Sequence, residues 1–445
     1  MDGALGLAST ARFQAWRALL SGERVITHNL IVGSGTIGAG LLGVAFQSFF
    51  SHRLQPSDYG AVFAIVSLLS LIALPATAFQ LLMARESSRD RVTGRYAVSA
   101  AVLRQGNRAL IVFGSALAAV VVLISPLLAQ FLAIPAQLLV ATAVGIPFGL
   151  ALPLLIGEFQ GEQRFMWFSL LAIGQAACKL IAAVALGAIW GPLGIVAGIS
   201  LATLLMYAVA VLGLRRKLSI RSSASWRRPA ARYLAIVLPS TLALGVLLST
   251  DVLLVKHYFS TQAAGQYSAV AALGRAIFWG ATGVATVLFP KVIARRVGGE
   301  SGIHLILVSV ALVGLGGLLA FALLSIGSAG LLAAFAGSGY AAASSYMPWY
   351  ALAMTLLGGA AVLIATHQAA GRAGFLAVLL PLTVVEPALV VAFHQTLLQV
   401  VQVVDESMAL VFVGLGALYL VQQRSQGATT MRLVTGQVAP VRVNQ

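Results

Sequence analysis

Four ionisable side chains lie inside long segments that otherwise carry almost no charge, and their chemistry is the first clue in this sequence. Lys179 and Arg275 are the cations, and Asp251 and Glu386 are the acids. Ionisable residues inside apolar spans are costly, so they usually line a cavity or contact a partner. Arg binds phosphate in a bidentate manner and Lys supplies a point charge. The two acids are candidates for binding a proton or a cation.

Structural roles are the alternative for three of these residues. Lys179 and Arg275 could form ion pairs with acids of other spans, or extend toward the membrane interface. Asp251 could pair with Lys256 or with Arg275. In each case the charge would stabilise the fold and would not meet a ligand.

Glu386 lies between two prolines, Pro381 and Pro387. Proline frees backbone carbonyls, and a carboxylate beside them can complete an ion site. The alternative is a kinked helix in which Glu386 faces a neighbouring polar side chain. Both interpretations stay open at the level of sequence.

The composition requires a lipid environment. Of 445 residues, 60% are hydrophobic and only 9% are charged, whereas a soluble domain carries about a quarter charged residues. The 45 glycines suit close packing of membrane helices. We therefore expect an all-α integral membrane protein and exclude a soluble enzyme.

Several other function classes lack their sequence signatures. The net charge of +16 comes from basic residues between apolar stretches, without the aromatic and basic pattern of nucleic-acid binders. The single Cys178 excludes an internal disulfide. The six histidines lack metal-ligand spacing, and no phosphate-binding P-loop or catalytic nucleophile motif occurs. We expect no metal, no cofactor and no enzymatic activity.

About twelve transmembrane helices fit the uncharged stretches, since one crossing needs about 20 apolar residues. Single spans are predicted within 25–52, 59–84, 233–255, 264–290, 373–393 and 407–423, and two each within 109–157, 165–214 and 301–371. Turns are predicted near 133–135, 190–192 and 337–345.

The distribution of Lys and Arg orients these spans. The side that holds both termini collects nearly all loop cations, and the other side receives only Arg53 and Lys256. The positive-inside rule places both termini in the cytoplasm. The predicted organisation is a cytoplasmic N-terminal segment at 1–27, a six-helix bundle at 28–214, a basic linker at 215–232, a second six-helix bundle at 233–423 and a cytoplasmic tail at 424–445.

The two halves contain a weak internal repeat. Tyr59 precedes Arg85 by 26 residues in the first half, and Tyr267 precedes Arg295 by 28 in the second. Six spans per half insert both halves the same way up, so the repeat is parallel. Transporters built this way often place substrate between the halves and rock one half against the other.

Several short motifs, in order along the chain, resemble the oligosaccharide flippase (Wzx-like) family of the multidrug/oligosaccharidyl-lipid/polysaccharide (MOP) transporter superfamily. They are Arg53, Leu54, Pro56, Asp58, Tyr59 and Gly60; Gly161 to Phe165; Asp251 with Gly265, Gln266 and Tyr267; and Phe289, Pro290 and Lys291. The resemblance extends from about residue 25 to 425 and implies a MATE-like arrangement of the two bundles.

The resemblance implies a secondary transporter in the bacterial inner membrane that flips a polyprenyl-diphosphate-linked oligosaccharide for surface polysaccharide assembly. Lys179, Arg275 and Arg85 would then line a cationic cavity for the diphosphate, although Arg85 also suits a plain interfacial anchor. Asp251 and Glu386 would bind H+ or Na+ as coupling ion. Membrane lipids and a polysaccharide polymerase are the expected partners.

Two other functions remain open. A multidrug/cation antiporter of the same superfamily would favour buried acids in the first half, and the predicted spans there hold none away from their ends. A membrane polysaccharide polymerase would need a large outer loop, and every predicted outer loop is short.

Overall fold

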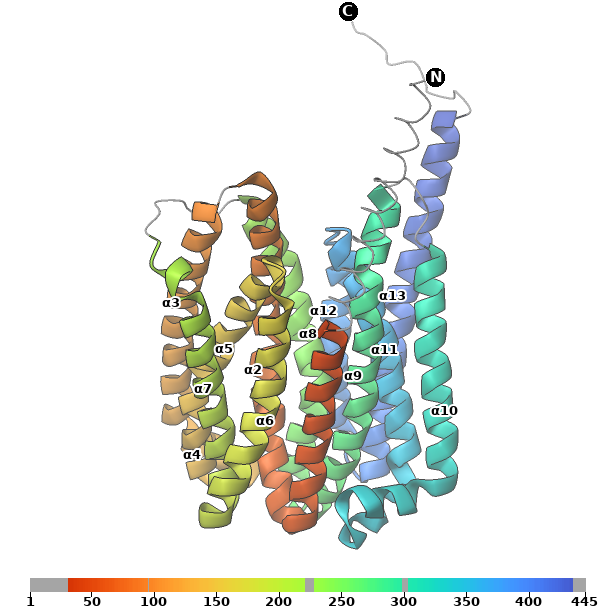
Figure 1. Ribbon diagram of the computed structural model, residues 1–445. Coiled ribbons are helices and arrows are strands. Elements are labelled where there is room, and N and C mark those ends of the chain that lie inside the picture. Colours follow the sequence, from red (N-terminus) through yellow and green to blue (C-terminus); the bar gives the residue numbers. More distant parts are fainter. Residues whose placement is uncertain (1–30, 95, 221–227, 298–302, 435–445) are drawn as a thin grey trace, which may run out of the picture. The chain divides into compact units, whose positions relative to one another are not determined.

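The computed structural model describes residues 31–94, 96–220, 228–297 and 303–434, and helices make up nearly all of them (Figure 1). No strand occurs within these ranges. The predicted N-terminal segment 1–27 lies outside the described residues, as do 221–227 of the predicted linker and 435–445 of the predicted tail.

Twelve long helices in the described ranges correspond one by one to the twelve predicted spans. They are Ile31–Arg53, α2 (Pro56–Thr93), α3 (Tyr96–Leu123), α5 (Ala136–Gly161), α6 (Phe165–Trp190), α7 (Pro192–Leu218), α8 (Arg228–Tyr258), α9 (Thr261–Val297), α10 (Ile303–Ala336), α11 (Met347–Ala369), α12 (Leu376–Ala392) and α13 (Leu397–Val434). The short α4 (Ser125–Leu132) follows α3, and the 3₁₀ helix η1 (Ser338–Tyr346) follows α10.

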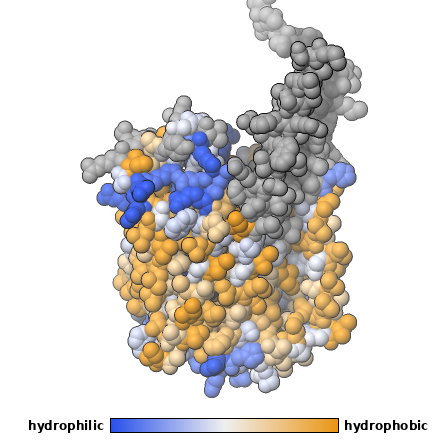
Figure 2. Space-filling model, viewed as in Figure 1, coloured by the Kyte–Doolittle hydropathy of each residue, from blue (hydrophilic) through white to orange (hydrophobic). Residues whose placement is uncertain are grey.

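Within the described residues, ten helices are long and apolar enough to cross a membrane, and the 17-residue α12 is a shorter apolar helix. Large apolar side chains remain exposed along them, including Ile37, Leu315 and Ile326. In Figure 2 hydrophobic surface covers the middle of the helices, and hydrophilic surface gathers toward their ends. Water would oppose this arrangement and lipid favours it. The chain is a multi-pass membrane protein.

The predicted turns are confirmed. Ala133 adopts a φ of 48° two residues before Pro135, the N-cap of α5. Gly191 adopts a φ of 57° between α6 and α7, a conformation that glycine accepts without steric cost. The predicted break near 337–345 is η1.

Two predicted boundaries are wrong. The predicted spans 59–84 and 109–157 leave 85–108 as a connecting loop, but α2 continues to Thr93 and α3 begins at Tyr96. The last span was predicted to begin at 407, but α13 begins at Leu397 and so contains Asp405 and Glu406. Both errors have one cause, because charges were taken as the limits of a span. A helix satisfies its own backbone hydrogen bonds, so it can carry charges and continue beyond the hydrocarbon.

The helices form two compact units. Unit 1 comprises 1–48, 76–129 and 134–231, and unit 2 comprises 49–75, 130–133 and 232–445. In unit 1, α5 packs against α3 and α7, and α6 packs against α7. In unit 2, α11 packs against α9, α10 and α13. The contiguous bundles 28–214 and 233–423 stay a prediction.

The start of α2 and the start of α9 approach each other closely within unit 2. A Cβ on Gly60 would lie 2.9 Å from the Cα of Gly265, and a Cβ on Gly265 would overlap the carbonyl of Pro56. Only glycine lets the two backbones come this close. Both glycines belong to the motifs that carry the family resemblance.

We expect Gly265→Ala to destabilise unit 2 by about 1–3 kcal/mol, because the added methyl meets backbone and no flexible side chain can move aside. Thermal unfolding of the purified protein in detergent measures this loss. Gly280→Ala on the same helix is the matched control, since a Cβ there has nothing within 4 Å. Equal unfolding temperatures for the two variants would contradict the close packing.

Candidate substrate and ion site

An ion pair between α8 and α9 forms the centre of the candidate site. Arg275 Nη2 lies 3.4 Å from Asp251 Oδ1, and both side chains are almost fully buried. Of the two partners predicted for Asp251, the structure selects Arg275. Lys256 lies on the same helix, is also buried, and has Asp58 as its neighbouring charge.

Two tyrosines complete the hydrogen bonds of Asp251. The hydroxyls of Tyr267 and Tyr350 donate to Oδ2 at 2.9 and 2.7 Å. Tyr350 reaches the carboxylate because α11 lies close to α9 at Gly274, where a Cβ would overlap the tyrosine ring. Asp251 is therefore a carboxylate held by one cation and two neutral donors.

Arg275 also contacts α2, in the part of that helix that belongs to unit 2. Its Nη1 donates to Ser67 Oγ at 2.9 Å, and its guanidinium lies 4.9 Å from the centre of the Phe63 ring. Ser67 follows Tyr59 by eight residues, and Arg275 follows Tyr267 by eight residues. The contact thus joins corresponding positions of the internal repeat.

Glu386 on α12 is the least satisfied group near this pair. Its side chain is fully buried, and neither carboxylate oxygen has a hydrogen-bond partner in the part of the chain that the structure describes. The charges of Asp251 and Arg275 both act on it. A buried carboxylate without a partner is strongly disfavoured as an anion. Binding a proton or a cation would remove that cost.

The cluster lies away from the ends of the helices that form it. At 1.5 Å per residue, Asp251 lies about 10 Å from the end of α8, Ser67 about 16 Å from the start of α2 and Arg275 about 21 Å from the start of α9. These helix ends belong to one side, because the α8–α9 connection is short and α2 begins beside α9. A hydrocarbon core is about 30 Å thick.

Lys179 lies in unit 1, on α6, and is half-buried. Its Nζ lies 4.6 Å from the centre of the Phe46 ring on the first helix, a cation–π contact. It makes no ion pair with any described residue. Pairing with an acid was one structural role predicted for Lys179, and the described residues do not provide such a partner.

Arg85 is exposed on α2 of unit 1, two turns before that helix ends at Thr93. It does not belong to the Asp251–Arg275 cluster, which lies in unit 2. Its exposed position suits contact with solvent or with lipid headgroups.

A second acidic group of unit 2 lies outside the spans predicted from the sequence. Asp405, Glu406 and Gln402 on α13 line a pocket of about 300 Å³ with Trp349 of α11. Asp405 Oδ1 is buried without a hydrogen-bond partner among the described residues. A hydropathy search that allows two charged residues per span would place Asp405 and Glu406 inside the last predicted span.

Buried acids also occur in unit 1, at one end of its helices. Glu158 and Asp90 are fully buried and Glu86 nearly so. Glu158 lies three residues before the end of α5, and the other two lie in the last two turns of α2. The prediction that the first six spans hold no acids away from their ends is consistent with these positions.

Comparison with known proteins identifies the fold. No protein-family model matches the chain, and no curated protein matches it in sequence. Among solved structures, an inward-facing multidrug resistance MATE family transporter of the MOP superfamily matches with a TM-score of 0.69 and 14% identity, covering 92% of this chain and 99% of that one.

Two further solved structures show the same fold. The lipid II flippase MurJ, in an inward closed conformation, matches with a TM-score of 0.66 and 13% identity over 88% of this chain and 87% of that one. A MOP superfamily transporter from Pyrococcus furiosus matches with a TM-score of 0.62 and 14% identity over 90% and 96%. The predicted MATE-like fold is confirmed: this chain has the fold of MOP superfamily transporters.

Proposed function

We propose that this chain is a secondary transporter that flips a polyprenyl-diphosphate-linked oligosaccharide from the inner to the outer leaflet of the bacterial plasma membrane. It works by alternating access, and both termini are cytoplasmic. The observation that carries the proposal is a buried Arg–carboxylate cluster within long helices, in a chain with the MOP transporter fold. The sequence resemblance to oligosaccharide flippases supplies the substrate class.

The cations bind the diphosphate. Lys179 is half-buried in its span and makes no ion pair with a described residue, so its charge is available to an anionic ligand. Arg275 is occupied by Asp251 and Ser67, and its Nε has no partner in the described chain. A guanidinium released from Asp251 would offer the forked geometry that phosphate prefers.

The acids couple transport to an ion gradient. Asp251 holds Arg275, and Glu386 lies within electrostatic range of both. When Asp251 or Glu386 takes up H+ or Na+, the hold on Arg275 weakens and the cation can turn to the substrate. When the ion leaves, Asp251 recovers Arg275 and the substrate is released. A polysaccharide polymerase would use the product on the outer face.

A cation antiporter is the second candidate function. The unpartnered Glu386 favours it, because a buried carboxylate can also bind a cationic drug. One solved structure with this fold is a multidrug resistance transporter, and for the Pyrococcus furiosus protein a reversed polarity of the binding pocket suggests a different function. The sign of the charge that meets the substrate therefore separates the two candidates.

We expect cells that lack this protein to accumulate polyprenyl-diphosphate oligosaccharide and to lose surface polysaccharide. The wild-type gene should restore both, and Lys179→Ala should restore surface polymer at least tenfold less well, because hydrogen bonds to charged groups contribute about 1.5–3 kcal/mol. Extracted lipids are quantified by mass spectrometry, and surface polymer is stained on intact cells.

Lys179→Arg is the matched control, since it keeps the charge at this position and should retain most of the activity. Unchanged lipids and polymer in cells lacking the protein, together with altered sensitivity to cationic drugs, would refute the flippase and support the antiporter.

A further inference from the structure

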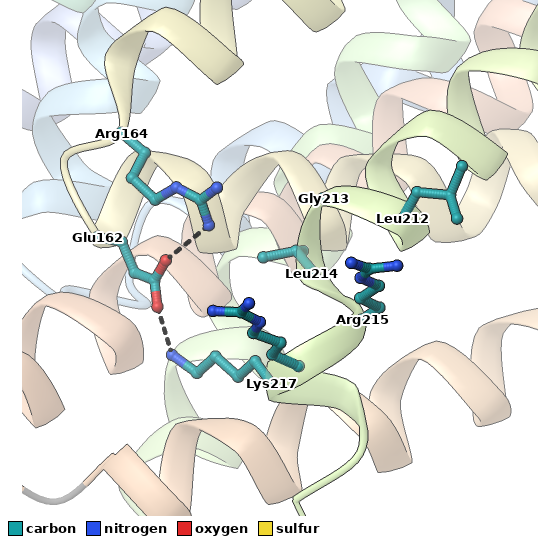
Figure 3. Close-up of a pocket in the computed structure, with 8 residues that line it drawn as sticks. Glu162, Arg164, Leu212, Gly213, Leu214, Arg215 and Lys217 are labelled. Atoms are coloured by element: carbon teal, nitrogen blue, oxygen red, sulfur yellow. Dashed lines mark hydrogen bonds and ion pairs between the residues drawn. The ribbon is translucent and has the colours of Figure 1, made fainter.

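A pocket of about 430 Å³ opens at the end of α7 in unit 1, away from the residues used above (Figure 3). Four cations, Arg164, Arg215, Arg216 and Lys217, line it together with a single acid, Glu162. This volume falls in the range of ligand pockets, about 300–1,000 Å³. The excess of positive charge calls for an anionic ligand.

The acid of the pocket is already neutralised. Glu162 accepts a hydrogen bond from Lys217 at 3.0 Å and another from Arg164 at 3.3 Å. Burial raises the pKa of the Glu162 carboxyl, but the hydrogen bonds and charge of Lys217 outweigh burial and lower its pKa below the usual value. Lys217 also pairs with the fully buried Glu158, which accepts a hydrogen bond from Ser87. These ion pairs and hydrogen bonds hold Glu162 and Lys217 in place at one side of the pocket.

Aromatic rings contact Arg164, the second partner of Glu162. The Arg164 guanidinium lies 4.7 Å from the centre of the Phe159 ring and 5.5 Å from that of Trp167, and the two rings are stacked. α7 approaches these rings at Gly213, where a Cβ would lie 3.0 Å from Phe159. The Arg164 side chain is thus positioned before any ligand arrives.

Arg215 and Arg216 supply the uncompensated charge. Both are exposed, and neither side chain has an ion pair or hydrogen bond with a described residue. In Figure 3 the Arg215 side chain lies beside Leu214 and Leu212, while Glu162 is joined to Arg164 and Lys217. The end of a helix carries only about half a negative charge, which two guanidinium groups exceed. Phosphate is the anion whose geometry matches such groups.

An exposed apolar stripe descends from this pocket along α7. Leu201, Leu205, Ala208 and Leu212 are all exposed, and their spacing places them on one face of the helix. Leu212 lines the pocket itself. A ligand that fits both features carries a phosphate on an apolar chain.

We propose that this pocket binds the headgroup phosphate of an anionic phospholipid, whose acyl chain lies along the stripe of Leu201, Leu205, Ala208 and Leu212. With the orientation proposed above, the lipid belongs to the inner leaflet, where anionic lipids attract basic segments. The site is separate from the Asp251–Arg275 cluster, so it stands whether or not the chain is a flippase.

Native mass spectrometry of the full-length protein in detergent tests this site. Dioleoyl phosphatidylglycerol should bind the wild type in preference to dioleoyl phosphatidylcholine. The Arg215→Ala/Arg216→Ala variant should bind phosphatidylglycerol at least tenfold more weakly, since each cation near the surface contributes to headgroup attraction. Binding of phosphatidylcholine should not change.

Arg104→Ala/Arg108→Ala on α3 of the same unit is the charge-matched control and should keep phosphatidylglycerol affinity within twofold. Equal weakening by both double variants would reduce the effect to diffuse charge and overturn the site. Equal wild-type affinity for the two lipids would overturn it as well. So would binding of inorganic pyrophosphate without any preference for phosphatidylglycerol, which would assign the pocket to a phosphate from another source.

Discussion

Arg275→Ala should abolish restoration of surface polysaccharide and leave the lipid-linked intermediate accumulated. The substitution removes the guanidinium proposed to meet the diphosphate, and it also leaves Asp251 as a buried charge with only its tyrosine donors. Breaking a buried ion pair from one side costs about 3–5 kcal/mol. Loss of activity in this variant alone would therefore not separate binding from folding.

The double variant Arg275→Ala/Asp251→Asn makes that separation. The double variant leaves no uncompensated buried charge at this pair, so it should regain part of the unfolding temperature that Arg275→Ala loses. Transport should stay absent if Arg275 meets the substrate. Recovery of both stability and transport would show that the pair only supports the fold, and the role of Arg275 in binding would be refuted.

The number and order of the helices could be predicted from hydropathy, because a bilayer fixes how many apolar residues each crossing needs. The helix ends could not. Charged residues mark where a chain leaves the hydrocarbon, yet the helix carries on as long as its backbone hydrogen bonds are satisfied. Asp405 and Glu406 show the consequence, since a rule that excluded charges from spans left both acids outside the last predicted span, although α13 contains them.

The charged members of the candidate site were recognisable in the sequence, but their partners were not. Asp251 was open to pairing with either of two cations, and only the packing of α8 on α9 decides for Arg275. Tyr350 donates a hydrogen bond to Asp251 from 99 residues away, and no local sequence pattern predicts such a contact. Long-range partners depend on tertiary structure that a single sequence does not display.

The contact of Ser67 with Arg275, in contrast, had a signal in the sequence. Ser67 follows Tyr59 by the same eight residues that separate Arg275 from Tyr267. In a parallel repeat with an axis along the membrane normal, corresponding positions can meet at that axis. The hydrogen bond of 2.9 Å between Arg275 and Ser67 joins two corresponding positions of the predicted repeat. The repeat, read position by position, would have pointed to this serine.

The same contact suggests how the site could respond to an ion. Arg275 is shared between an acid of the second half and a serine of the first, and both groups compete with any anionic substrate for its donors. A change of charge on the acid should therefore change how firmly Arg275 is held to α2 and α8 within unit 2. Glu386 is the group best placed to add to such a change, since its own carboxylate lacks a hydrogen-bond partner among the described residues.

Glu386→Gln is accordingly expected to uncouple transport from its driving ion. The amide has nearly the shape of the carboxylate but can neither take up a proton nor supply a negative charge for Na+, so flipping in proteoliposomes should lose its response to an imposed ion gradient. We expect the gradient-driven rate to fall at least tenfold, while the unfolding temperature stays equal or rises, because a buried carboxylate without a partner costs more than an amide. Flipping of a fluorescent lipid-linked sugar, followed with and without the gradient, measures the response.

Asp405→Asn is the matched control, since Asp405 is another acid of unit 2 inside a span, on α13. It should keep the response to the gradient. The opposite pattern, in which Asp405→Asn loses the response and Glu386→Gln retains it, would move the coupling site from the Asp251–Arg275 cluster to the pocket between α11 and α13. In that case Asp251 would be the acid that acts on Arg275, and Asp405 would replace Glu386 as the group that binds the coupling ion.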